Sequence, residues 1–147
     1  MSILFHTGIC VAEYNCYKEG ACLYNMKPIF LEAIGLKFPK LNIIGAHLGY
    51  AMYNVACAIA AASAYGSGNI FFDISGSDIS LREIPERGYV NRDIPVSQLL
   101  WGLDEPLTRY EEVIKIWKKH FNEINLSKEE KDMIFYKNAC DLLNINY

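Results

Sequence analysis

Three apolar runs of strand length in this chain each end in a side chain that can bind a metal or carry a proton. The runs and the residues that follow them are 3–5 with His6, 41–46 with His47, and 98–103 with Asp104. Continuous apolar runs of this length are typical of strands buried on both faces of a parallel sheet. Since the carboxyl ends of parallel strands open onto one side of the sheet, this pattern predicts an α/β fold with a candidate active site at that side.

Helical patterns separate these runs. The predicted order is strand 3–5, helix 26–38, strand 41–46, helix 52–65, strand 69–75, strand 98–103, helix 109–121 and helix 138–143. Ser127 and Glu130 are spaced as a capping box before a further helix, and residues 77–96 are predicted to form a short helix and a long loop. Four strand units in 147 residues are about 37 residues each, near the ~31 of an eight-unit barrel of about 250 residues. The pattern therefore predicts one domain, residues 1–147, that is half of a (β/α) barrel.

Composition limits the partners and the compartment. The formal net charge is −3 and the basic residues are scattered, which argues against nucleic acid as a partner. No secretory signal pattern or membrane-spanning run is recognisable, so we expect a protein with no membrane partner. The cysteines are odd in number, lack a Cys-x-x-Cys pair and are expected to be small apolar packing residues in a reducing cytoplasm: Cys10, Cys16, Cys22, Cys57 and Cys140.

Several motifs resemble, in order, those of one known family. They are Pro28–Pro39 (PIFLEAIGLKFP), Leu41–Gly49 (LNIIGAHLG), Asn69–Gly76 (NIFFDISG), Leu100–Pro106 (LWGLDEP) and Asn138–Ala139. Together they are similar to the amidohydrolase-related family, which includes metal-dependent hydrolases and decarboxylases of the aminocarboxymuconate-semialdehyde type. The resemblance covers only the fifth to eighth strands of the family's TIM barrel. It implies a parallel half-barrel that corresponds to the C-terminal half of that domain.

The resemblance also implies roles for the strand-end residues. His6 matches a metal ligand, His47 a catalytic histidine that faces the reacting group or a second metal, and Asp104 a metal ligand that also carries a proton. The family's first-strand His-x-His pair would lie before the first residue, and Leu103 stands where the family usually has Thr. Imidazole and carboxylate suit a divalent ion, with zinc the first choice, but two ligands are fewer than the three that catalytic zinc usually takes.

The implied function is a metal-dependent hydrolase acting on a small organic acid, amide or lactone, incomplete as this chain. Two alternatives stay open: a nonoxidative decarboxylase of the same superfamily, and a non-catalytic truncated or assembly subunit. A half-barrel leaves two strand edges unpaired, so we expect a homo-oligomer, in which the His6 strand of one copy pairs with the Asp104 strand of another, or a complementary N-terminal half. A doubly wound binding domain is less favoured, because no glycine-rich phosphate loop follows a strand.

Other polar residues have weaker claims to the site. Asp73 is expected near the carboxyl end of its strand, as a hydrogen-bonding residue and not a metal ligand. His120 lies near a helix end, where a surface role that complements the helix dipole is expected. The remaining candidates are loop arginines that either clamp a substrate carboxylate or are simply solvated: Arg82, Arg87 and Arg92.

Overall fold

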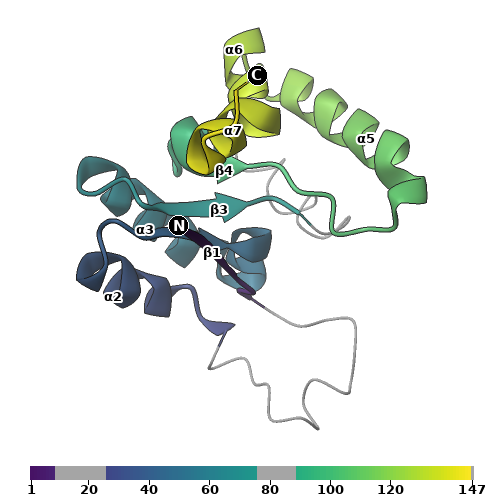
Figure 1. Ribbon diagram of the computed structural model, residues 1–147. Helices are drawn as coiled ribbons and strands as arrows, with labels where there is room; N and C mark the ends of the chain where they lie inside the picture. Colours follow the sequence, from purple (N-terminus) through teal and green to yellow (C-terminus); the bar gives the residue numbers. More distant parts are fainter. Residues whose placement is uncertain (9–25, 76–88, 147) are drawn as a thin grey trace, which may run out of the picture.

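A computed structural model describes residues 1–8, 26–75 and 89–146 of the chain (Figure 1). Its sheet has four parallel strands: β1 (Ser2–Phe5), β2 (Asn42–Gly45), β3 (Ile70–Asp73) and β4 (Leu99–Leu100). Their order in the sheet, β1-β2-β3-β4, is also their order along the chain. A (β/α) barrel adds its strands in this way, whereas a doubly wound sheet reverses direction at a switch point. The predicted parallel α/β class is confirmed.

The helices follow the predicted order, with ends that differ by a few residues. They are α2 (Ile29–Lys37), η2 (Ala46–Met52), α3 (Tyr53–Tyr65), η4 (Val96–Gln98), η5 (Leu107–Arg109), α5 (Tyr110–Glu123), α6 (Lys128–Asp132), the π-helical turn η6 (Met133–Lys137) and α7 (Asn138–Leu143). The capping box is confirmed, because the Ser127 hydroxyl accepts from the Glu130 N–H and the Glu130 carboxylate accepts from the Ser127 N–H. Within the described part of the chain, no helix has the length and apolar character needed to cross a membrane.

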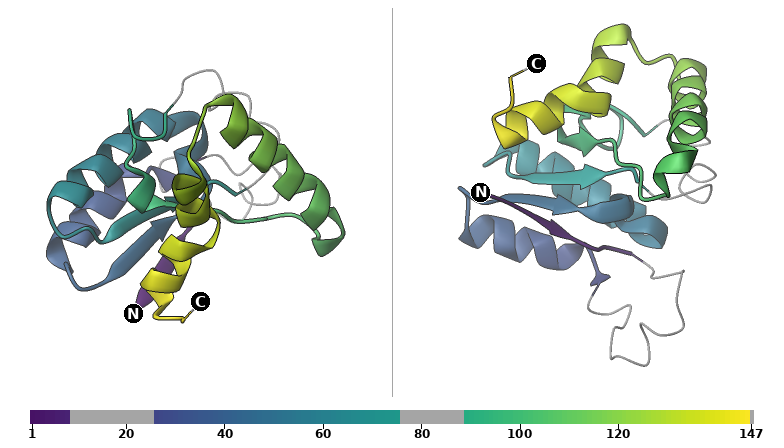
Figure 2. Two further views of the ribbon diagram at one scale, coloured as in Figure 1. Left: turned by 90° about the horizontal axis from the view of Figure 1, so that it is seen from above. Right: turned by 45° about the vertical axis from the view of Figure 1, so that its right-hand side comes forward.

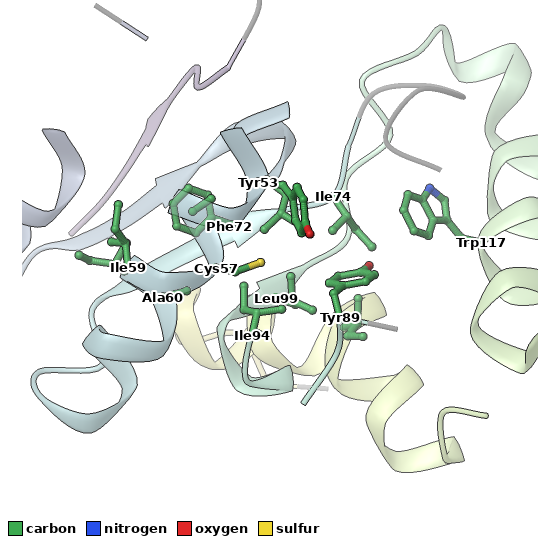
Figure 3. Close-up of a cluster of buried hydrophobic side chains, with 14 of the residues drawn as sticks. Tyr53, Cys57, Ile59, Ala60, Phe72, Ile74, Tyr89, Ile94, Leu99 and Trp117 are labelled. Carbon is green, nitrogen blue, oxygen red and sulfur yellow. The ribbon is translucent and has the colours of Figure 1, made fainter. Parts of the chain in front are cut away.

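The core lies between the sheet and the two helices on one of its faces, α2 and α3 (Figure 2), and it continues to buried residues of α5 and η6. Phe72 of β3 and Leu99 of β4 are fully buried. They lie in the same cluster of side chains as Cys57 and Ala60 of α3 (Figure 3). Gly45 of β2 has no room for a side chain, because a Cβ atom there would overlap the Phe72 ring. This close approach explains why a glycine stands at the end of a strand that is otherwise apolar.

The opposite face of the sheet is partly open. Leu4, Ile44 and Phe71 are register partners on β1, β2 and β3, so their side chains form one row across this face. Leu4 is 60% exposed, and the other two are half-buried. Phe71 and Leu142 of α7 line a hollow of about 360 Å³ at one end of the row. In a closed barrel this row would face the interior.

The free edge of β4 is covered by the chain's own C-terminal segment, which the sequence did not predict. The Leu100 carbonyl accepts from the N–H of Ile74, the residue that follows β3, so the backbone N–H and C=O groups of Leu99 and Trp101 point away from the sheet. There the Trp101 N–H donates to the Ile134 carbonyl over 2.9 Å, and the Asn138 side-chain amide donates to the Leu99 carbonyl over 2.8 Å. The backbone groups that a pairing of this edge with β1 of another copy would use are therefore already bonded within the chain.

His120 is buried, with 4% of its surface exposed, and the predicted surface role is wrong. Val113, Trp117, His120 and Phe121 recur at helical spacing and form the buried face of α5. The imidazole lies against the rings of Trp117 and Phe121, at centroid distances of 5.9 and 6.0 Å. Burial lowers the pKa of His120, because the charged ring loses its water, and the carboxylate of Glu123 opposes this shift more weakly.

Stability is therefore expected to fall when His120 gains a proton. The ordinary histidine pKa is ~6.5, so between that pH and the lower pKa of the folded state the unfolded chain binds more protons. The contribution of the neutral ring is complete above about pH 6.5 and is lost as the pH falls towards the folded-state pKa. In urea titrations across this window, His120→Phe should show a weaker loss of stability with acid than the parent chain. His6→Gln, at an exposed position, is the control, and an unchanged slope in His120→Phe would contradict the prediction.

Candidate active site

The three strand-end residues come together at the carboxyl side of the sheet. His6 directly follows β1, His47 lies two residues after β2, and Asp104 lies four residues after β4. His47 is the centre of the group. Its Nε2 atom is 3.2 Å from Nδ1 of His6, and its Nδ1 atom is 3.8 Å from Oδ2 of Asp104. The two imidazole rings meet edge to face with centroids 4.8 Å apart.

The group is buried at its base and open at its rim. The His47 side chain is 15% exposed and the Asp104 side chain 59% exposed, and His6 is also exposed. Because the rim of the group is exposed, a small molecule can reach His47. The buried base of the group holds the imidazole ring in place. The arrangement suits proton transfer to or from a bound small molecule.

An unusual backbone holds His47 in place. Residues His47, Leu48, Gly49 and Tyr50 all have positive φ angles, between 45° and 70°. For residues other than glycine this conformation costs on the order of 1 kcal/mol each and requires support from neighbours. Thr7, after β1, provides some of it, because its buried hydroxyl donates to the Ala46 carbonyl and accepts from the Gly49 N–H over 3.1 Å.

Two residues at the end of β3 complete the surroundings of His47. Asp73 Oδ1 accepts from the His47 N–H over 3.0 Å and from the Ser75 N–H over 2.9 Å. The Ser75 hydroxyl donates to the same carboxylate oxygen, and it lies 3.1 Å from Nδ1 of His47. Asp73 was expected at this end of the sheet, but the contact of Ser75 with His47 was not. The available signal was the spacing, since residues two apart at a strand end face the same side.

The donors fit a divalent metal in kind but not in number. The 3.2 Å between His47 Nε2 and His6 Nδ1 is close to the ~3.3 Å expected for two nitrogens that each bind one tetrahedral zinc at about 2.0–2.1 Å. Asp104, however, lies nearest the other nitrogen of the His47 ring. Among the residues that the structure describes, no three His, Cys, Asp or Glu side chains are grouped to hold one ion. The described residues thus do not form a complete metal site.

The remaining candidates take other roles or lie outside the described residues. Burial raises the pKa of the Cys57 thiol to about 12, so this cysteine is a packing residue and not a nucleophile. Cys140 is half-buried. Arg92 is engaged with its neighbour, as its Nε donates to Asp93 Oδ1 over 2.9 Å. Outside the described residues lie the predicted helix near Ser77 and these side chains: Cys10, Cys16, Cys22, Arg82 and Arg87.

Comparison with known proteins gives both a family model and structural neighbours. A family model described as amidohydrolase matches residues 2–145. A TIM-barrel protein of uncharacterised function from Bordetella bronchiseptica has a similar fold, with a TM-score of 0.62 and 14% identity over 98% of this chain and 46% of its own. Amidohydrolase 2 from Bifidobacterium longum subsp. infantis has a TM-score of 0.47 and 19% identity, over 79% of this chain and 45% of its own. No curated protein matches. The chain thus spans about half the length of these solved structures, and its sheet is that of a partial barrel.

Proposed function

Because this chain belongs to the amidohydrolase family, we propose that it carries the strand-five-to-eight half of a metal-dependent hydrolase acting on a small organic acid, amide or lactone. The observation that supports this most directly is the contact of one imidazole, that of His47, with both His6 and Asp104. Ring nitrogens and a carboxylate at the carboxyl ends of parallel strands are the groups that acyl hydrolysis needs for proton transfer.

In the proposed reaction His47 and Asp104 divide the proton transfers. Asp104 accepts the proton of the attacking water, and His47 polarises the substrate carbonyl or returns a proton to the leaving group. The 3.8 Å between His47 Nδ1 and Asp104 Oδ2 is too long for a direct hydrogen bond. Asp104 therefore exchanges its proton with the exposed side of the site through a water molecule, and not directly with Nδ1 of His47. His6 contacts His47 on its other ring nitrogen.

The proposed cofactor is a divalent metal, zinc by preference, to which His6 and Asp104 contribute. When bound, such an ion lowers the pKa of a coordinated water to about 7. Since catalytic zinc usually takes three protein ligands, further ligands are proposed to come from a complementary half of the barrel, in the same protein or in a second molecule. The half-length match to the solved TIM-barrel neighbour supports this arrangement.

Zinc is accordingly expected to bind weakly to the purified chain. Two ligands from this half leave coordination positions to water, so most of the zinc should be lost on dialysis against a chelator. His6→Ala should remove the remaining binding, whereas Cys140→Ala, at a half-buried position on α7, should leave it unchanged. The measurement is zinc content by atomic spectroscopy before and after dialysis. One tightly held zinc per chain would contradict the proposed division of ligands.

The proposed function is tested by following hydrolysis directly. The chain, supplied with zinc and with a complementary N-terminal half of an amidohydrolase barrel, is assayed against a panel of lactones, amides and acyl derivatives of small acids, with acid release measured in a pH-stat. We expect turnover that requires added zinc and falls by about 10²- to 10⁴-fold in His47→Ala. His120→Phe is the control histidine variant and should keep the parent rate.

The same assay separates the alternatives. Release of carbon dioxide without hydrolysis would replace the proposed hydrolase by the decarboxylase of the same superfamily. Absence of turnover across the panel, or a rate that His47→Ala leaves unchanged, would overturn the proposal and favour a non-catalytic subunit.

A further inference from the structure

We propose that Ser75, supported by Asp73, is a positioning residue that holds His47 in the tautomer with its proton on Nδ1. This inference deepens the proposed function, because it identifies the nitrogen of His47 that carries the reactive lone pair. It follows from the direction of each hydrogen bond around the end of β3. The pattern of strand-end residues in the sequence did not predict that Ser75 and Asp73 position the His47 ring.

The carboxylate of Asp73 determines the direction of its hydrogen bond with the Ser75 hydroxyl. Its Oδ1 atom lies within hydrogen-bond distance of the backbone N–H groups of His47 and Ser75, which can only donate. Oδ1 is thus an acceptor, and the third group bonded to it, the Ser75 hydroxyl, supplies the hydrogen of that bond. Asp73 and Ser75 are 8% and 5% exposed, so solvent competes little for these bonds.

The hydroxyl of Ser75 then has no hydrogen left for His47. A serine hydroxyl has one hydrogen and two lone pairs, and here the hydrogen points to Asp73. The hydroxyl oxygen and the carbonyl oxygen of Ser75 lie 3.1 and 3.2 Å from His47 Nδ1, and both are therefore acceptors. Two acceptors directed at one ring nitrogen require that nitrogen to be the donor. Nδ1 of His47 carries the proton.

The other ring nitrogen of the neutral imidazole is then an acceptor. Nε2 of His47 is the atom that lies 3.2 Å from Nδ1 of His6, so His6 donates in that contact. The lone pair of Nε2 thus lies on the exposed, His6 side of the site, where a substrate proton or an electrophile would replace the His6 contact. A histidine that bonds through Nδ1–H to an oxygen and presents Nε2 is the usual arrangement of a general base or a ligand.

Packing keeps Ser75 in position. Gly102, beyond β4, lies so close that a Cβ atom there would be 2.8 Å from the Ser75 Cβ atom. Asp73 has a second task, because it also bonds to the His47 N–H at the start of the segment with positive φ. The Ser75 hydroxyl, in contrast, contacts the His47 ring without bonding to that backbone. Ser75 is therefore the residue at which the tautomer can be tested without altering the backbone.

The test is ¹⁵N NMR of the metal-free chain labelled in its histidines, at about pH 8.5, well above the ordinary histidine pKa of ~6.5. The chain has three histidines, and the His47 signals are identified by their loss in His47→Gln. We expect Nδ1 of His47 to be protonated and Nε2 to be unprotonated. In Ser75→Ala one of the two acceptors is lost, and the ratio of the Nδ1–H to the Nε2–H tautomer should fall by about 2- to 10-fold.

Ser63→Ala is the matched control, because Ser63 is also buried beside β3, where its hydroxyl accepts from the Ile70 N–H. It should leave the His47 tautomer unchanged. Ser75→Cys, with a weaker acceptor of similar size, replaces Ser75→Ala if the latter does not fold. Protonated Nε2 in the parent chain, or a ratio that neither Ser75 variant changes, would overturn the inference. Since no substrate is used, a negative hydrolysis assay with the expected tautomer would overturn only the proposed function.

Discussion

Phe72→Ala is expected to remove most of the stability of this domain. Phe72 is fully buried, lies directly beside Gly45 and belongs to the same core cluster as Leu31 and the buried residues of α3. Truncating a buried phenylalanine costs about 3–5 kcal/mol, because apolar contacts are lost and a cavity remains. Natural domains have ~5–15 kcal/mol in total, so the variant should unfold at much lower urea concentration or fail to fold at 25 °C.

The control is a change of similar size at the surface. Tyr65→Ala removes an aromatic ring that is 94% exposed at the end of α3. Its effect on the free energy of unfolding should stay within about 0.5 kcal/mol. Both variants are compared with the parent by circular dichroism in urea at one protein concentration. Equal midpoints for Phe72→Ala and Tyr65→Ala would mean that the core is not organised around β3 as described.

The purified chain is expected to self-associate. β1 ends the sheet with no further strand beside it among the described residues, and Leu4 is 60% exposed in the open row that includes Ile44 and Phe71. An unpaired strand edge next to an exposed apolar row favours pairing with another chain. Sedimentation velocity at micromolar concentration should therefore show a dimer or a larger species.

Leu4→Lys should reverse this association, because a charge in the open row opposes burial of that face. The average mass is expected to fall by half or more, to that of a monomer. Leu36→Lys is the control, since Leu36 is 78% exposed on α2, the helix on the covered face of the sheet. A parent chain that sediments as a monomer over the whole concentration range would contradict the prediction.

Local patterns in the sequence were sufficient for the order of elements and for the strand-end residues. Each apolar run specifies a buried strand, and parallel strands bring their ends to one side, which is why His6 and His47 are neighbours although 41 positions separate them. The fourth strand is shorter than predicted. The Trp101 N–H turns to the Ile134 carbonyl, and Asp104 has a φ of 46°, so the strand ends at Leu100.

Features that depend on long-range hydrogen bonds could not be predicted from such patterns. The contact of Ser75 with the His47 ring requires the sheet register and the positive φ angles after Ala46, neither of which a run of apolar residues specifies. Asn138 was visible as part of a motif, but its bond to the Leu99 carbonyl requires the packing of α7. The burial of His120 follows from its place among the regularly spaced apolar residues of α5, which matters more for this side chain than its position near the helix end.

The covered edge of β4 limits how far association can proceed. In the described residues only β1 presents strand groups to a new chain, because Asn138 and Ile134 occupy those of β4. A molecule with one unpaired strand edge can pair with one other molecule, β1 to β1 about a two-fold axis. The resulting dimer then has no unpaired edge for a third molecule. If the chain self-associates through β1 as expected, the bonded edge of β4 should limit that association to a dimer and prevent a fibre.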